Sequence, residues 1–318
     1  MTRVSGPSTA WILLGVLSGG LLGLYLPIIS PALIWGQWGL LTLMVFLVVV
    51  SLPLLSIGRA IAKPRVLAAL FALNLIVVPL VAFVFSRVLF QVPALQVGLL
   101  LVLLAPGVAL SLTTAYEAGG DVESVLGSKP LLFVGQLVVV PLYTVFLSGG
   151  VLGFDDLPPT FIVIGLVIIA PSLVALALQW AMARSASVAA SRRWLTMIRV
   201  PVIALTVGVV VWNQVPAHLE ELEQLLRVVP LFFSFFVLLA PLGLLAGILA
   251  SLTVAEKRAI MIVGAGRGGV IMLPISLALD QDVWGLVPLV VITQLAMEVI
   301  GMMVYRTIVP EIIPSGSR

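Results

Sequence analysis

The sequence predicts an all-α membrane protein with about ten spanning helices, arranged as two inverted repeats of five helices whose fourth and ninth members are broken. Three observations predict this fold. The composition is too apolar for a protein surrounded by water, the basic residues are sorted between alternate loops, and glycine- and proline-rich interruptions recur in two spans about half the chain apart.

The composition decides the class of protein. The chain has 318 residues, of which 62% are hydrophobic and 9% are charged, and its mean hydropathy is +1.28. Soluble domains carry about 25% charged residues, so most of this surface must face lipid. The composition excludes a soluble enzyme, a nucleic-acid-binding module and a disordered chain. Cysteine is absent, which excludes disulfides and thiolate metal sites, and no cofactor is expected.

Ten apolar stretches are long enough to cross a bilayer, which takes about 20 helical residues. They lie at residues 10–27, 39–57, 66–89, 95–117, 128–148, 160–182, 196–213, 228–251, 258–279 and 284–305. The first stretch follows Arg3 and has some features of a signal peptide. Nine further stretches follow it and no small-residue cleavage site ends it, so we interpret it as a span.

The basic residues indicate the orientation. When the N-terminus is placed in the cytoplasm and the loops alternate, thirteen of the sixteen lysines and arginines fall on the cytoplasmic side. They are Arg3, Arg59, Lys63, Arg65, Lys129, Arg184, Arg192, Arg193, Arg199, Lys257, Arg258, Arg306 and Arg318. The outer side holds Arg87 and Arg227, and Arg267 alone falls inside a span. This bias follows the positive-inside rule and predicts an even number of spans in the cytoplasmic (inner) membrane, with both termini cytoplasmic.

The two interruptions occupy matching places in the two halves of the chain. The fourth span contains Ala105-Pro106-Gly107 and the ninth contains Gly264-Ala265-Gly266, so that Gly266 follows Gly107 at an offset of 159. Asp121 and Asp280 repeat this offset of 159, and the Gln-Leu pairs that begin at Gln136 and Gln294 are 158 residues apart.

Five spans in each half require the halves to enter the membrane in opposite directions. We therefore expect residues 1–158 and residues 159–318 to be inverted repeats within one membrane domain. Inverted repeats with broken helices are typical of transporters, and their binding site lies at the breaks.

Arg267 lies among Gly264, Gly266, Gly268 and Gly269 in the ninth span. Each glycine weakens a helix by about 1 kcal/mol relative to alanine and leaves backbone groups open to a solute, although small residues also serve close helix packing. A charge at bilayer depth costs about 2.5–3.5 kcal/mol. Three roles remain open for Arg267: an anion site, a fixed charge where a cation would otherwise bind, or a structural pair with a buried carboxylate. A shifted register would instead bring it toward the interface.

Glu298 is the second ionisable residue at bilayer depth, within the tenth span. A carboxylate buried beside an arginine can change its protonation during a transport cycle. The alternative is a fixed salt bridge to Arg267, and the two interpretations can both hold if the pair breaks and reforms.

Uncharged polar residues also fall inside the spans. They are Asn74, Ser111, Thr113, Thr114, Gln136 and Gln294. Singly, such residues serve as hydrogen bonds between helices, but Ser111, Thr113 and Thr114 follow Pro106-Gly107 closely enough to reach a solute at the first break. His218 is the only histidine and lies in 216–227, which is expected to lie as an amphipathic helix at the outer interface; no role is assigned to it.

Four stretches carry a resemblance to a known family. They run from Lys63-Pro64 through Asn74 to Pro79, over Ala105-Pro106-Gly107, over Gly119-Gly120-Asp121-Val122, and from Thr293-Gln294 through Glu298 to Tyr305. In order and spacing they resemble the bile acid:sodium symporter family of the bile/arsenite/riboflavin transporter superfamily, and more narrowly its bacterial arsenic-resistance-like members. The resemblance implies ten spans in two inverted repeats, divided into a panel and a core, with the substrate cavity beside two broken helices that cross in the core.

The sequence departs from this family at the sites that would hold sodium. Symporters of the family carry a Glu-x-Gly-x-Gln-Asn motif at the second break, where this chain has Ile262, Gly266 and Arg267 in place of the carboxylate and the two amides. The Ser-Asn pair of the first break is Ser111-Leu112 here. Hard cations need oxygen ligands, so sodium coupling is not expected. Glu298 resembles the glutamate of arsenite permeases, but their cysteine has no counterpart.

These observations predict a secondary transporter that works by alternating access. We expect its solute to be a small anion, an oxyanion or an organic acid bound near Arg267, with protons coupled through Glu298. Arsenical efflux and sodium-coupled, bile-acid-like uptake remain alternatives within this class. A passive channel needs a polar stripe along several helices, whereas the polar residues here cluster at the two breaks. An intramembrane enzyme needs a nucleophile–base pair or a metal triad, whereas the lone His218 lies outside the spans. Both classes are therefore disfavoured. The expected partners are the solute and the lipid bilayer; the solute's identity, the direction of transport and the oligomeric state stay open.

Overall fold

The computed structural model describes residues 5–27, 30–52, 63–107 and 109–314. The predicted cytoplasmic charges Arg3, Arg59 and Arg318 lie outside these ranges. All regular structure in the described part of the chain is helical, as predicted. Eight helical segments there are long and apolar enough to cross a membrane, and Ala10–Tyr25 and Pro93–Leu104 are shorter apolar helices. The protein is therefore a multi-pass membrane protein, and the count of ten spans stays a prediction.

The helices follow one another in this order. They are α1 (Ser5–Tyr25), α2 (Pro31–Val50), α4 (Pro64–Ala72), η2 (Leu73–Val77), α5 (Val78–Val88), α6 (Pro93–Leu104), α7 (Ala109–Glu117), α8 (Val122–Leu126), α9 (Ser128–Ser148), η3 (Phe154–Asp156), α10 (Pro158–Val163), η4 (Ile164–Ile169), α11 (Ala170–Arg184), α12 (Ala186–Ala189), α13 (Ser191–Gln214), η5 (Pro216–Arg227), α14 (Val229–Leu249), α15 (Val254–Ala265), α16 (Gly269–Ala278), α17 (Gln281–Trp284) and α18 (Val287–Ile312).

Most predicted spans match these helices within a few residues. The fifth predicted span, 128–148, has the bounds of α9. The second prediction, 39–57, begins too late, because Ser30 caps α2 with its Oγ atom 3.2 Å from the Leu33 amide and Pro31 occupies the first turn. The last prediction ends too early, since α18 continues to Ile312.

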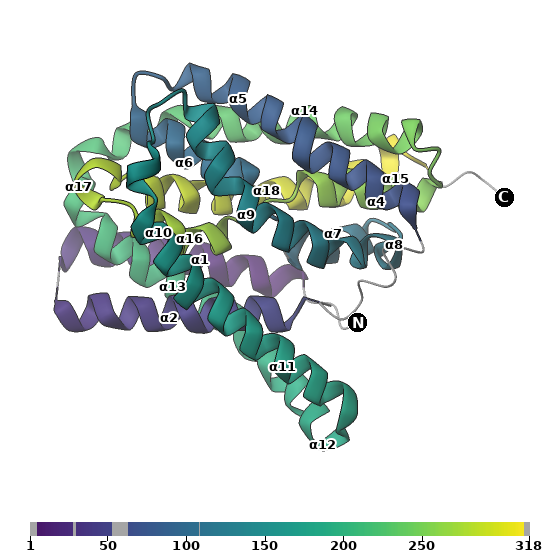
Figure 1. Cartoon of the computed structure of the whole chain (residues 1–318), viewed down its shortest axis with the longest axis horizontal. Helices are drawn as coiled ribbons and strands as arrows, with labels where there is room; N and C mark the ends of the chain where they lie inside the picture. Colours follow the sequence, from purple (N-terminus) through teal and green to yellow (C-terminus); the bar gives the residue numbers. More distant parts are fainter. Residues whose placement is uncertain (1–4, 28–29, 53–62, 108, 315–318) are drawn as a thin grey trace.

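A first group of helices consists of α1, α2, α11 and α13. In Figure 1, α1, α2 and α13 lie along one side of the molecule, while α11 runs obliquely away from the rest and ends at α12. A Cβ atom added to Gly15 or Gly19 of α1 would collide with the carbonyl oxygen of Ala204 or Gly208 of α13. Small residues thus let these two helix backbones touch.

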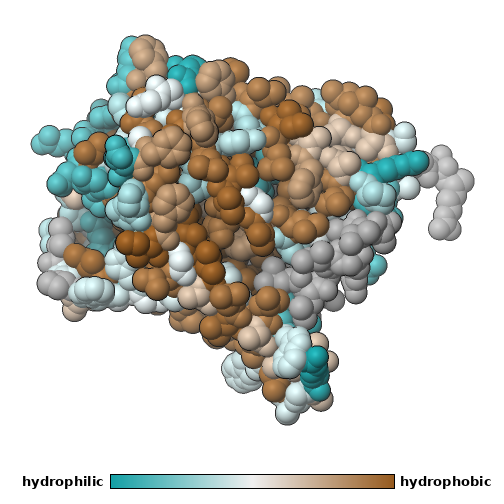
Figure 2. Space-filling model, in the orientation of Figure 1, coloured by the Kyte–Doolittle hydropathy of each residue, from teal (hydrophilic) through white to brown (hydrophobic). Residues whose placement is uncertain are grey.

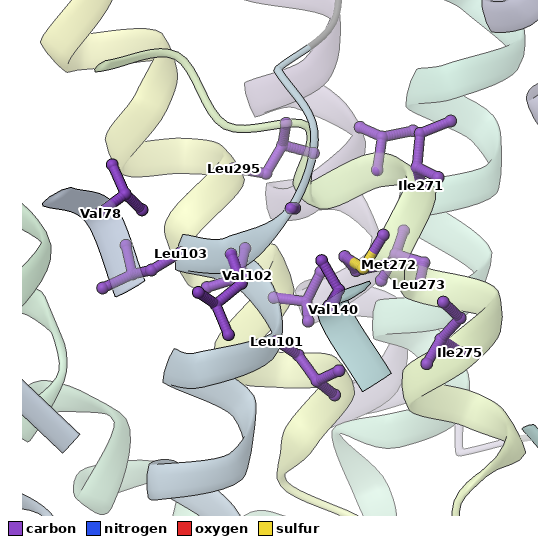
Figure 3. Close-up of a cluster of buried hydrophobic side chains, with 14 of the residues drawn as sticks. Val78, Leu101, Val102, Leu103, Val140, Ile271, Met272, Leu273, Ile275 and Leu295 are labelled. Carbon is purple, nitrogen blue, oxygen red and sulfur yellow. The ribbon is translucent and has the colours of Figure 1, made fainter. Parts of the chain in front are cut away.

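The second group holds the centre of the molecule. It contains α4 to α9 and α14 to α18, and every residue from Arg258 to Leu277 is buried within it. Figure 3 shows its apolar core, in which Leu101 to Leu103 of α6, Val140 of α9, Ile271 to Leu273 of α16 and Leu295 of α18 come together. A helix enclosed by protein can be interrupted at bilayer depth, because its freed backbone groups find protein partners instead of lipid.

The surface is apolar over the middle and polar toward the ends. Figure 2 shows hydrophobic residues across the broad centre of one face, with hydrophilic residues gathered mostly toward its left and right ends. Large apolar side chains such as Phe146 (67%), Leu166 (67%) and Val138 (63%) are exposed, which would be unfavourable in water. This distribution is the one that a protein surrounded by lipid needs.

Candidate functional site

Both predicted interruptions are breaks in helices. The helix α6 ends at Leu104, the next residues Ala105 to Gly107 are not helical, and α7 begins at Ala109. The helix α15 ends at Ala265, and α16 begins at Gly269 after three non-helical residues. The prediction of broken helices at these two places is confirmed.

The two breaks lie directly against each other. A Cβ atom on Gly107 would stand 2.5 Å from the carbonyl oxygen of Gly266, and one on Gly266 would collide with the Cβ atom of Ser111. On either side of this contact α6 packs against α16 and α7 packs against α15. Glycine is required at both positions because any side chain would push the two backbones apart.

Arg267 joins the two breaks from the interior. Its side chain is fully buried (0% exposed), and its Nη1 atom donates to Asn74 Oδ1 at 3.0 Å and to the Ala105 carbonyl oxygen at 3.4 Å. Its Nη2 atom donates to the carbonyl oxygen of Gly264. The guanidinium therefore binds a carbonyl group from each broken helix, and its Cζ atom lies 5.6 Å from the centre of the Phe235 ring.

Glu298 binds the backbone of Arg267 and not its guanidinium. Its Oε1 atom accepts from the Arg267 amide at 3.0 Å, and its Oε2 atom accepts from Gln294 Nε2 at 3.4 Å. Both residues are described by the structure, and no guanidinium nitrogen lies within ion-pairing distance of the carboxylate. The fixed salt bridge, which was the alternative for this pair, is therefore not formed, because Asn74 and the two carbonyl groups hold the guanidinium instead.

Lys129 belongs to this site, although the charge pattern placed it among the cytoplasmic loop residues. It is 3% exposed, and its Nζ atom donates to the Gly107 carbonyl oxygen at 3.0 Å and to Ser111 Oγ at 3.3 Å. The sequence did not indicate this position, because a lysine at the start of a span has the same pattern as a loop charge. The close approach of α9 to the first break decides it.

The buried cluster holds two cations and one carboxylate. Among the buried charged residues of the described chain, Glu256 is paired with Lys63, and Arg258 donates to helix-end carbonyl groups, including that of Ile313. Lys129, Arg267 and Glu298 remain at the two breaks. Buried charge without an equal counter-charge is costly, so this cluster can accept one further negative charge.

The other predicted site residues divide into two sets. Gln136 Nε2 donates to the Leu104 carbonyl oxygen at 2.9 Å, and the Gln294 side chain lies against Gly269 as well as Glu298. Asn74 lies in the π-helical turn η2, and such turns are frequent at functional sites. Thr114 instead donates to the Leu110 carbonyl oxygen of its own helix at 3.1 Å, and Thr113 is half-buried in that helix.

The motif residues at the predicted cytoplasmic end hold three elements together. Lys63 Nζ lies 2.6 Å from Glu256 Oε1 and 3.8 Å from Asp121 Oδ2. The hydrogen bond to Glu256 raises the pKa of Lys63 above its usual value. Asp121 caps α8 through the Ser124 amide, and Gly120 lies against the backbone of Ala259. These contacts join α8 and α15 to the residue that precedes α4.

A surface groove of about 290 Å³ lies elsewhere, between α1 and α13. Its walls include Trp11, Gly15, Gly19, Gly208 and Trp212, and no charged residue lines it. It opens on the apolar surface of the first helix group, so its chemistry does not fit a charged solute.

The fold and the site together define a multi-pass membrane protein with a buried charged site where two broken helices meet. A sequence model of the Sodium Bile acid symporter family matches residues 39–214, more than half of the chain. The chain belongs to this family, which places it among membrane transporters. None of the curated proteins compared with it matches.

The family match covers only one of the two breaks. It includes Asn74, Gly107, Ser111 and Lys129, and it ends before Arg267 and Glu298. The pairing of the two breaks therefore comes from the structure and not from the match.

Proposed function

We propose that this protein is a secondary active transporter of a small anionic solute, such as an oxyanion or an organic acid. The observation that carries the proposal is the buried cluster at the meeting point of the two breaks, where Arg267 and Lys129 exceed the single carboxylate Glu298 by one positive charge. An anion would balance this charge and find freed backbone groups beside it.

Alternating access fits the two groups of helices. The charged site lies wholly in the second group, while α1, α2, α11 and α13 form a separate wall beside it. We infer that the second group moves against this wall, as a core against a panel. The contact between breaks 159 residues apart supports inverted repeats of five spans each at residues 1–158 and 159–318. The sorting of basic residues between alternate loops supports cytoplasmic termini in the inner membrane.

We infer that protons, and not sodium ions, drive transport. Glu298 is a buried carboxylate whose two oxygens are held by an amide and by Gln294, so it can couple protonation to the second break. Backbone oxygens that a sodium ion would need are engaged by side-chain cations: Ala105 and Gly264 by Arg267, and Gly107 by Lys129.

Sodium-coupled symport of a bile-acid-like organic anion is the alternative, and family membership favours it. Arsenical efflux is supported by the resemblance of Glu298 to the glutamate of arsenite permeases. A passive channel is less favoured, because Lys129, Arg267 and Glu298 gather at the two breaks and do not form a stripe along the helices.

Purified protein in proteoliposomes tests the proposal. Radiolabelled anions are screened under an imposed proton gradient and, separately, under an imposed sodium gradient. We expect proton-driven flux that falls at least about tenfold in R267K, which keeps the positive charge but loses the fork of donors, and in E298Q, which keeps the size of the side chain but removes its charge. R184K, at an arginine stacked on Trp180 in the first group, is the matched control.

Each outcome of this experiment has a definite meaning. Unchanged flux in both folded variants would remove the roles given to Arg267 and Glu298. Flux that follows the sodium gradient alone would establish the symporter alternative, and rates far above those of carriers would establish a channel.

A further inference from the structure

Lys129 is one of three lysines in the chain, and its ammonium group lies in the protein interior. Lysine is almost never fully buried unless it is paired. The partners of this one are two neutral oxygens, the Gly107 carbonyl at 3.0 Å and Ser111 Oγ at 3.3 Å. Both oxygens belong to the interrupted helix and flank the start of α7.

No carboxylate of the described chain lies within ion-pairing distance of Lys129 Nζ. The charged side chains near enough to act on it are Arg267, which repels it, and Glu298, which attracts it. The ammonium is therefore held by backbone and hydroxyl oxygens, which are the ligands that proteins offer to small hard cations.

The break itself accounts for these oxygens. Because α6 stops at Leu104, the carbonyl groups that follow have no partner within the helix. Gln136 binds that of Leu104, Arg267 that of Ala105, and Lys129 that of Gly107. Two of these three carbonyl groups thus face a positive charge, supplied in one case by the second break and in the other by α9.

We propose that the oxygens of Gly107 and Ser111 form a small cation site at the first break, and that Lys129 fills this site with a tethered ammonium group. The ligand class of the emptied site is a monovalent cation, best matched by a primary alkylammonium ion. A tethered cation cannot exchange with the solution. If the proposed function holds, transport therefore needs no free cation at this position.

Two substitutions separate the site from its occupant. K129A removes the ammonium and leaves space, whereas K129M removes the charge but keeps most of the side-chain volume. We expect both variants of the full chain in detergent to unfold about 5 °C or more below the wild type, because the Gly107 carbonyl loses its partner. Methylammonium should raise the unfolding temperature of K129A in a saturable manner by at least half of this loss, through binding to the folded state. It should leave K129M and the wild type unchanged.

Two controls make the test specific. K257A applies the same change to a half-buried lysine of α15 and should not respond to methylammonium. Choline at equal concentration controls for ionic strength, and its quaternary nitrogen has no N–H group to donate to the Gly107 carbonyl. An equal response of K129A and K129M, or no response of K129A, would overturn the proposal.

The proposal stays testable if K129A is too unstable to melt. The measurement is then the yield of monodisperse K129A purified with methylammonium or with choline; a higher yield with methylammonium supports the site, and equal yields refute it. These measurements do not involve transport. A negative result with methylammonium would therefore refute the cation site and not the proposed anion transport. Unchanged flux in R267K and E298Q would refute the roles proposed in transport and not the cation site.

Discussion

The two breaks meet at one point but satisfy their freed backbone groups in opposite ways. The first break presents carbonyl groups, and those of Leu104, Ala105 and Gly107 accept from side chains of other elements. The second break presents an amide, that of Arg267, which donates to the Glu298 carboxylate. Side-chain cations therefore lie at the carbonyl groups that follow α6, and a carboxylate lies at the amide that precedes α16.

This difference shows where each break gets its polar partners. The second break carries its own charge, because Arg267 lies within it and also binds the carbonyl of Gly264. The first break contains no charged residue among its described residues Ala105 to Gly107, and α9 supplies Gln136 and Lys129 to it. The freed carbonyl groups of the first break thus bind side chains from other parts of the chain, whereas one of the partners at the second break, Arg267, belongs to that break.

Removal of Arg267 should have the largest effect on stability. R267A leaves the buried oxygens of Asn74, Ala105 and Gly264 without this donor, and losing one partner of a buried charged network costs about 3–5 kcal/mol. R267K keeps the charge but not the fork of donors, so it should recover part of this loss. Thermal unfolding in detergent measures both variants. A loss for R267A no larger than that for Q136L would contradict the view that this side chain joins the two breaks.

Alanine at the contact between the breaks should come next. In G107A the new Cβ atom meets the Gly266 carbonyl, and in G266A it meets Ser111, so we expect each to cost about 1–3 kcal/mol through overpacking. Gly135 of α9 has open space around it, and G135A should be neutral or stabilise the protein by up to about 1 kcal/mol. Equal unfolding temperatures for all three variants would show that the breaks do not touch as described.

The loss of Gln136 should be smaller and should fall on the first break alone. Q136L leaves the carbonyl of Leu104 unpaired, which costs about 1–3 kcal/mol for a buried acceptor. Proteolysis or hydrogen exchange of peptides from α6 and α7 should increase, while peptides from α15 and α16 stay protected. Equal deprotection of both breaks would mean that they open as one unit.

The ion pairs at the predicted cytoplasmic end should matter least, and their effect should depend on pH. The pKa of Lys63 is raised mainly by its hydrogen bond to Glu256, so its contribution is present below the pKa of the unfolded lysine, about 10.4, and disappears as the pH rises through the higher folded value. The difference in unfolding temperature between the wild type and K63M should therefore be constant near neutral pH and vanish in strong base. A difference that grows with pH would contradict this sign.

The sequence predicted the class of protein, the helical fold and both breaks because these depend on local properties. A bilayer demands long apolar stretches, and Ala105-Pro106-Gly107 and the glycines around Arg267 cannot continue a helix at low cost. In the structure Arg267, Glu298, Asn74, Gln136, Gln294 and Ser111 lie around the breaks, and their part in binding stays a prediction. Thr114 bonds within its own helix instead, and substrate, coupling ion and repeat symmetry stay proposals.

The sequence by itself determined that this chain lies in a membrane and that two of its helices are interrupted. The length of an apolar stretch and its glycine and proline content affect the conformation of that stretch alone, so no tertiary contact is needed to predict them. Only the tertiary structure decided that the Arg267 guanidinium binds carbonyl groups while Glu298 binds the Arg267 backbone amide, and that Lys129 is an interior residue. Both outcomes depend on which freed carbonyl group each cation can reach, and helix packing alone sets that distance.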